Sequence, residues 1–300
     1  MPHRHILRTI AMPAGMVIGA LACRPITALE AAAHQMITPT LIFLMLFITF
    51  CRVAPREMRL SPLHGWMLLF QAVVSLGVYA LLLPFDPIVA QGGLICVLAP
   101  IAMAAVVIGG MLGANVATMA TYSLLCNLVI ALVAPAILTF TGNGLCTFWQ
   151  ILARVSPLLI LPFVGAQACR WVLPRAAGWI GAHGQISFYL WLASLTVTIG
   201  RTTAFIIDRH NDASLTTEIA LAVVALLLCL LQFKTGRMLG RLYGDPAAGG
   251  QSLGQKNTVL AVWMAQSFLD PIASIAPTAY IVWQNFVNSY QLYRRDREQG

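Results

Sequence analysis

Four consecutive residues without apolar side chains, Gly254–Asn257, interrupt the beginning of a predicted membrane-spanning segment. The apolar run that follows them, Thr258–Leu269, has twelve residues, whereas a helix needs about 20 apolar residues to cross a bilayer. If this segment spans a membrane, its first third is polar. Irregular backbone at membrane depth is tolerated only where protein buries it or water lines it. A lysine at that depth, Lys256, therefore indicates a functional site.

The composition places the whole chain in a membrane. Hydrophobic residues make up 59% of the sequence and charged residues only 9%, as in polytopic membrane proteins. We expect an all-α protein, a single membrane unit over residues 1–300 without a soluble domain. Ten apolar segments are predicted, at residues 10–28, 36–51, 64–83, 91–110, 115–140, 149–168, 185–207, 216–233, 252–270 and 273–292.

The first segment also has features of a cleaved signal peptide, because basic residues precede a short apolar core that ends near Ala20. A helix-sized segment follows it directly, so a retained first span fits better.

Basic residues indicate the orientation of the predicted spans. Ten spans with a cytoplasmic N-terminus place most arginines and lysines in the inner connections, whereas the outer ones carry little beyond Arg24 and Arg209, as the positive-inside rule requires. The inner residues are Arg4, Arg8, Arg52, Arg56, Arg59, Arg170, Arg175, Lys234, Arg237, Arg241, Arg294, Arg295 and Arg297. Both termini are therefore expected in the cytoplasm, and the net charge of +8 is explained by topology without a nucleic-acid site.

Several classes of chemistry have no support in the sequence. The seven cysteines lack CxxC spacing, and the histidines form no helix-spaced pair with a carboxylate. There is no nucleophile with an adjacent base and no GxxxxGK[ST] motif. We therefore expect no enzyme, no metal site and no resident cofactor.

A second predicted span is interrupted in the same way. Pro100 lies in the middle of residues 91–115, and Gly109, Gly110 and Gly113 loosen the end of that segment. An ordinary proline kink is the simpler alternative. However, the two interruptions fall in the fourth span of each half of the chain, and halves of five spans run in opposite directions. Paired interruptions of this kind are the best sequence indication of a transporter binding site, where half-helix N-termini attract anions.

Four stretches in the same order resemble the bile acid:sodium symporter family. They begin at Pro39 (PTLIFLMLFITFCRVAPREMRL), Pro100 (with GANVA and NLVIALVAP), Gly254 (GQKNTVLA) and Ala276 (APTAYIVWQNFVNS). The resemblance implies two inverted five-helix repeats, here residues 1–140 and 148–293, forming a panel domain and a core domain. The fourth and ninth helices would be broken and cross. The resemblance also implies a bacterial inner-membrane transporter that binds an organic anion beside the crossing and sodium ions behind it.

The residues that match the family's sodium ligands are mostly altered. A Ser-Asn pair is replaced by Ala105 and Val106, and later hydroxyl ligands by Met119 and Ser123. In the ninth helix, Ser252 stands for a glutamate and Lys256 for a glutamine, whereas Gly254, Asn257 and the third-helix Gln71 are retained. Alanine, valine and methionine side chains supply no hard oxygen ligand. Sodium coupling is therefore expected to be weak or absent.

Our hypothesis is that Lys256 stands in for the bound cation, with Gln71, Ser252, Gln255 and Ser123 as further members of the ion site. Sodium and a charged Lys256 would repel each other at close range, and proton coupling or simple exchange would replace sodium coupling. The alternative is that Lys256 extends to the inner membrane surface and only marks topology.

The substrate site predicted from the resemblance contains Asn257, Lys256, Met103 and Ala104. A fixed positive charge at Lys256 favours an anion, and the resemblance implies a sterol acid, a pantoate-like acid or a 2-oxo acid. The competing function is a membrane sensor or receptor that binds its ligand on the same scaffold without transporting it. The sequence leaves the oligomeric state open.

Overall fold

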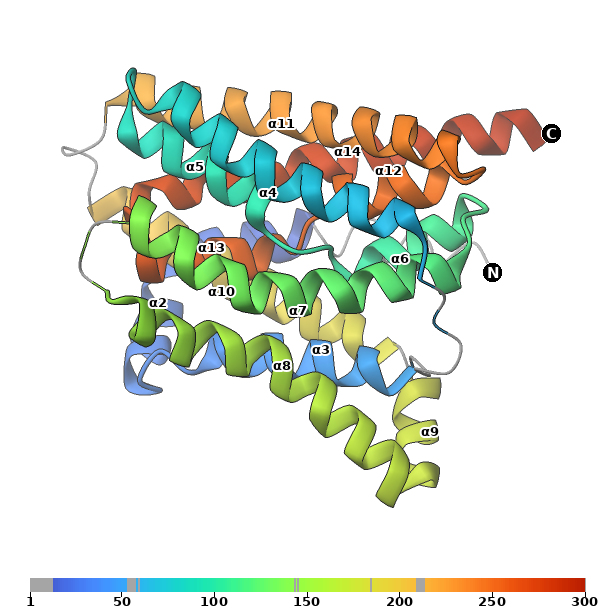
Figure 1. Ribbon diagram of the computed structural model, residues 1–300. Coiled ribbons are helices and arrows are strands. Elements are labelled where there is room, and N and C mark those ends of the chain that lie inside the picture. The colour runs from blue at the N-terminus through green and yellow to red at the C-terminus, as the bar shows by residue number, and fades with distance from the viewer. Residues whose placement is uncertain are drawn as a thin grey trace. The chain divides into compact units, whose positions relative to one another are not determined.

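The computed structural model of the chain describes residues 13–52, 58, 60–142, 144, 146–183, 185–208 and 214–299, with the backbone alone at positions 52, 103, 185, 187, 188, 296, 298 and 299 (Figure 1). These residues form helices and no β-strand, which confirms the all-α prediction. The chain divides into two compact units, and each combines two separate stretches of sequence. Unit 1 is Met1–Arg52 with Leu161–Ala213, and unit 2 is Val53–Ile160 with Ser214–Gly300.

Unit 1 contains an ion pair between the buried Glu30 and the half-buried Arg201. Its elements are a helix at Pro13–Leu21, α2 (Cys23–Ala32), α3 (Ile37–Arg52), the second part of α8 (Phe148–Val172), α9 (Pro174–Ala182) and α10 (Gln185–Asp208). The carboxylate of Glu30 accepts hydrogen bonds from the first N–H groups of α3, at Ile37 and Thr38. It also pairs with Arg201 of α10 at 3.2 Å. One side chain thereby caps α3 and connects α2, α3 and α10.

Unit 2 contains the interrupted segments and the rest of the helices. Its elements are α4 (Pro62–Leu82), α5 (Pro87–Leu98), α6 (Met103–Met111), α7 (Val116–Thr141), the first part of α8, α11 (Leu215–Leu242), α12 (Pro246–Gly254), α13 (Thr258–Phe268), the short 3₁₀ helix η2 (Pro271–Ser274) and α14 (Ile275–Gln299). The backbones of α11 and α12 approach closely at glycines. A Cβ atom on Gly236 would collide with the carbonyl of Gly249, and one on Gly249 would collide with that of Gly236. The Gly236-xxx-Gly240 spacing thus lets α12 lie directly on α11.

Several helices have the length and composition of membrane spans. Five pass both criteria: α4, α7, α8, residues Tyr189–Asp208 of α10, and α11. The pair Pro13–Leu21 and Cys23–Ala32, bent by 77°, would make a sixth. The most apolar window of α4 has a mean hydropathy of 1.8, yet only 17% of it is buried. Such an exposed apolar surface suits lipid far better than water. The chain is therefore a helical membrane protein.

Some predicted boundaries were wrong. The segment predicted at 252–270 begins earlier, because Pro246 opens α12 and the carboxylate of Asp245 accepts a hydrogen bond from the N–H of Ala248 at 2.8 Å. The polar residues Gly254–Asn257 consequently lie in the middle of the segment. In addition, α9 and the sharp bend that precedes α2 were not predicted.

Candidate functional site

The segment predicted at 91–110 consists of two helices joined by an extended stretch (Figure 1). α5 begins at Pro87, where Asp86 accepts hydrogen bonds from the N–H groups of Ile88 and Val89. It ends at Leu98, because Pro100 removes a backbone donor and restricts the residue before it. Ala99 and Ala102 are extended, with ψ angles of 137° and 152°. The prediction of a real interruption, as opposed to a kink, is confirmed.

The second interruption lies between α12 and α13. Gln255 leaves the helical conformation with φ −91° and ψ 97°, and α13 resumes at Thr258. The side-chain oxygen of Asn257 accepts a hydrogen bond from the N–H of Leu260 at 3.2 Å and so caps the new helix. Residues 254–257 are therefore the end of one half-helix and the start of the next.

The two interruptions pair with each other. The N–H of Ala102 donates to the carbonyl of Gln255 at 2.8 Å, and the N–H of Asn257 donates to the carbonyl of Pro100 at 2.8 Å. These bonds form an antiparallel bridge between Ile101 and Lys256. Both bridge residues are buried, so no water is needed to satisfy this backbone. Each break thus supplies the hydrogen-bond partners that the other lacks.

Lys256 lies at the C-terminal end of the half-helix α5. Its ammonium nitrogen donates to the carbonyl of Val97 at 2.9 Å, and only 1% of the residue is exposed. The alternative that Lys256 extends to the membrane surface is therefore wrong. The last carbonyls of a helix have no partner within it and carry a partial negative charge. A cation is the natural partner for that position, and here the protein supplies one.

Two glutamines engage the remaining carbonyls of this helix end. The amide nitrogen of Gln71, on α4, donates to the carbonyl of Leu98 at 2.7 Å and to that of Ala99 at 2.8 Å. Its oxygen accepts a hydrogen bond from the hydroxyl of Tyr122 at 3.1 Å. Gln232 of α11 donates to the carbonyl of Cys96 at 3.3 Å. The structure thus brings Gln71 and Lys256 together, as predicted, and adds Gln232, which was missed.

A row of polar residues on α14 holds the other side of the second break. Gln284 accepts a hydrogen bond from the backbone N–H of Lys256 at 3.0 Å, and the hydroxyl of Tyr280 donates to the carbonyl of Gly254 at 2.9 Å. The amide of Asn288 donates to the side-chain oxygen of Gln255. This role of the α14 residues was not predicted, although the spacing of residues 280, 284 and 288 places them on one helix face.

The remaining predicted site residues are more dispersed. Ser252 and Ser123 lie on α12 and α7, two helices that pack together. Both hydroxyls are buried, and neither has a hydrogen-bond partner within the described residues. Ala104 lies half-buried at the start of α6, and the side chain of Met103 is outside the described part of the structure. A role of these residues in substrate or ion binding stays a prediction.

Among the described residues, no group of three or more histidine, cysteine or acidic side chains could hold a metal ion. Comparison of the chain with models of known protein families gave no match, and comparison with curated proteins gave no significant similarity. The paired breaks are therefore the feature of this chain that points to a function.

Proposed function

We propose that this protein is a secondary transporter of a small organic anion that works by alternating access. The observation that carries the proposal is the pairing of two helix breaks inside the protein, with the ammonium of Lys256 on the carbonyl of Val97. Discontinuous helices that meet in this way form the substrate and ion sites of many transporters. Each interruption removes regular helix hydrogen bonds. Two buried interruptions are therefore more easily explained by a binding site than by a purely structural role.

The arrangement of the helices supports the same proposal. Each compact unit takes helices from both halves of the chain, as expected for a panel and a core built from inverted repeats. The ten spans that we propose are residues 13–32, α3, α4, α5–α6 as the fourth, α7, α8, α10, α11, α12–α13 as the ninth, and α14, with the short α9 outside this count. In the topology we propose, the arginine-rich ends of α11 and α14 face the cytoplasm of the bacterial cell.

Lys256 replaces a bound cation in this proposal. The carbonyls at the end of α5 are the kind of ligand that would hold sodium, but the lysine and two glutamines already occupy them. Ala105 and Met119 are fully buried and apolar, so they add no oxygen ligand. We therefore propose that transport has little or no dependence on sodium.

Counterflow across liposomes tests the function. Purified protein is reconstituted, loaded with an unlabelled sterol acid, pantoate or a 2-oxo acid, and exposed to the labelled compound outside. A transporter exchanges the two pools, whereas a sensor that only binds its ligand does not. Binding of an anion without any counterflow would contradict transport and favour the sensor.

The matched control for Lys256 is the other lysine of the chain, Lys234, which is exposed on α11. We expect Lys256→Gln to change counterflow or its cation dependence, whereas Lys234→Gln behaves as the wild type. Unchanged counterflow in both variants would remove Lys256 from the mechanism and leave transport itself standing.

A further inference from the structure

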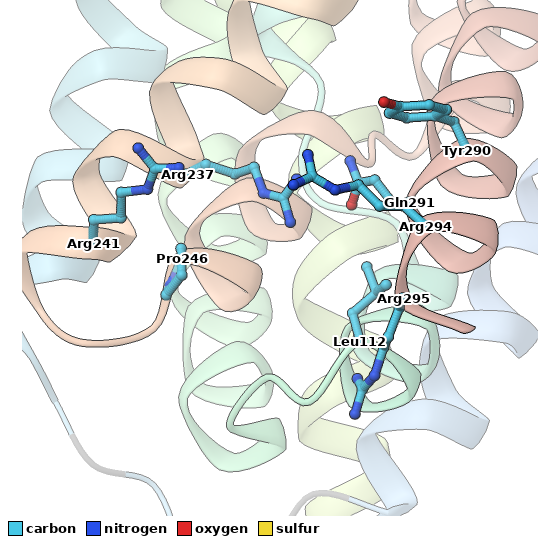
Figure 2. A pocket seen from close by; sticks show the side chains of 8 residues that line it. All are labelled: Leu112, Arg237, Arg241, Pro246, Tyr290, Gln291, Arg294 and Arg295. Atoms are coloured by element: carbon cyan, nitrogen blue, oxygen red, sulfur yellow. The ribbon is translucent and has the colours of Figure 1, made fainter. Parts of the chain in front are cut away.

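Unit 2 contains a cavity of about 490 Å³ that is unusually rich in arginine (Figure 2). It lies at the C-terminal ends of α11 and α14 and beside the first residue of α12. Eight residues line it: Leu112, Arg237, Arg241, Pro246, Tyr290, Gln291, Arg294 and Arg295. In Figure 2, Arg237 of α11 and Arg294 of α14 extend toward each other across the space between these helices, whereas Arg295 extends past Leu112.

The lining gives the cavity a strongly positive potential. Four of its described residues are arginines and none is acidic. Asp245, which precedes Pro246, lines a neighbouring cavity, and its two oxygens accept hydrogen bonds from the backbone N–H groups of Ala248 and Asn115. Asp245 therefore caps α12 and holds the start of α7, and the four arginines outnumber its single negative charge. Guanidinium groups stay charged at any physiological pH, so the cavity remains cationic.

Two of the arginines are positioned by the surrounding structure. The guanidinium of Arg295 donates to the carbonyl of Met111, the last residue of α6. The aliphatic part of Arg237 lies over Gly250, where a Cβ atom would meet the Cγ of Arg237 at 2.5 Å. Arg241 and Arg294 are exposed to solvent. The cavity thus combines two arginines packed against other elements with two that are exposed to solvent.

We propose that this cavity is a binding site for a phosphate-bearing anion, carried either by a phospholipid headgroup or by a soluble phosphate compound. Arginine forks bind oxyanions in a bidentate manner, and a phosphate offers more acceptor oxygens and more charge than a carboxylate. The volume exceeds that of a phosphate alone and lies in the usual range of small-molecule pockets. Basic pockets between the ends of membrane helices are typical sites of anionic headgroups.

The site is independent of the proposed transport function. Its residues lie at the ends of α6, α11, α12 and α14, whereas the paired breaks lie in the interior of α5–α6 and α12–α13. A failure of this proposal would consequently leave the transport proposal intact, and the reverse also holds.

The test measures the melting temperature of the full-length protein in two arms. In detergent at constant ionic strength, inorganic pyrophosphate is titrated in parallel with succinate. In nanodiscs, phosphatidylcholine alone is compared with an equal mixture of phosphatidylcholine and phosphatidylglycerol. The variant Arg241→Gln/Arg294→Gln removes the two exposed arginines. Its control, Arg175→Gln/Lys234→Gln, removes two exposed basic residues that do not line the cavity.

We expect stabilisation in at least one arm for the wild type and the control. The cavity variant should bind the same probe about tenfold or more weakly, because each lost charge-assisted bond weakens binding markedly. Stabilisation by pyrophosphate indicates a soluble ligand, whereas stabilisation only by phosphatidylglycerol indicates a lipid headgroup. The proposal is overturned if the cavity variant responds like the wild type in both arms, or if succinate stabilises as strongly as pyrophosphate. Should the double variant melt lower without ligand, the two single variants repeat the comparison.

Discussion

Each of the two compact units contains a basic residue with little exposure, half-buried Arg201 in unit 1 and buried Lys256 in unit 2, and the two contact different partners. Arg201 of unit 1 pairs with the carboxylate of Glu30 at 3.2 Å, and Glu30 is only 1% exposed. None of the ion pairs between described residues includes Lys256 of unit 2. Its ammonium bonds to a backbone carbonyl instead.

Under the proposed function, this difference is one between a structural charge and a functional one. Arg201 and Glu30 form a pair without net charge, and the carboxylate of Glu30 also caps α3. The two charges therefore compensate each other. Lys256 faces only the partial negative charge of a helix end, which is weaker than a full carboxylate. In the proposed function, the positive charge that remains on Lys256 attracts the anion. This comparison predicts that the first pair matters most for stability and that Lys256 matters most for function.

The largest effect on stability is expected from Glu30→Gln. This substitution keeps an oxygen for the N–H groups of α3 but leaves Arg201 without a counter-charge, which should lower the free energy of unfolding by about 3 kcal/mol. Chemical denaturation in detergent measures it. The double variant Glu30→Gln/Arg201→Gln should recover part of the loss. If the double variant is less stable than the single one, the pair does not act as a neutralised unit.

Gln71→Leu should have the next largest effect. It leaves the carbonyls of Leu98 and Ala99 buried without donors, at a cost of about 2 kcal/mol. Gln232→Leu is the matched control, since Gln232 engages one carbonyl of the same helix end at a longer distance. A smaller loss for Gln71→Leu than for Gln232→Leu would show that this helix end depends little on Gln71.

Asn257 allows capping to be separated from anion binding. Asn257→Ala should cost about 1 kcal/mol through the lost cap of α13. Asn257→Asp keeps a good capping oxygen and should remain close to wild-type stability, but its negative charge beside Lys256 should weaken anion binding. Unfolding and ligand titration on both variants provide the comparison. Normal anion affinity in Asn257→Asp would argue against a substrate site at this position.

The smallest effect on stability is expected from Lys256→Met. Removing a buried charge recovers its desolvation penalty, and this offsets the bond lost to Val97, so the net cost should stay below about 1 kcal/mol. Counterflow should nevertheless be abolished or altered in its cation dependence. A loss of stability as large as that of Glu30→Gln would make Lys256 a structural residue and remove the contrast with Arg201.

Local signals in the sequence located the two breaks. Pro100 and the polar run Gly254–Asn257 contradict a continuous membrane helix, and the structure interrupts both segments there. The start of α12 was missed because its sequence, PAAGGQSLG, is rich in glycine and weakly apolar. Those glycines allow close contact with α11, a property that hydropathy does not detect.

The partners of each buried charge could not be predicted in the same way. Glu30 and Arg201 are 171 residues apart, and Lys256 and Val97 are 159 apart. Such contacts depend on how distant helices pack, and no local pattern encodes them. Likewise, the arginines of α11 and α14 were interpreted as topology signals, and only the folded chain shows that they line one cavity.

The most direct test of the account is the thermal stability of wild-type protein and Lys256→Gln against a panel of organic anions, in sodium and in potassium at equal ionic strength. A ligand at about 100 times its dissociation constant adds about 2.7 kcal/mol to the stability. We predict that an anion stabilises the wild type equally in both salts, and that Lys256→Gln, with a neutral amide at this position, gains a preference for sodium. Stabilisation of the wild type that requires sodium would contradict the account, because a cation other than Lys256 would then complete the site.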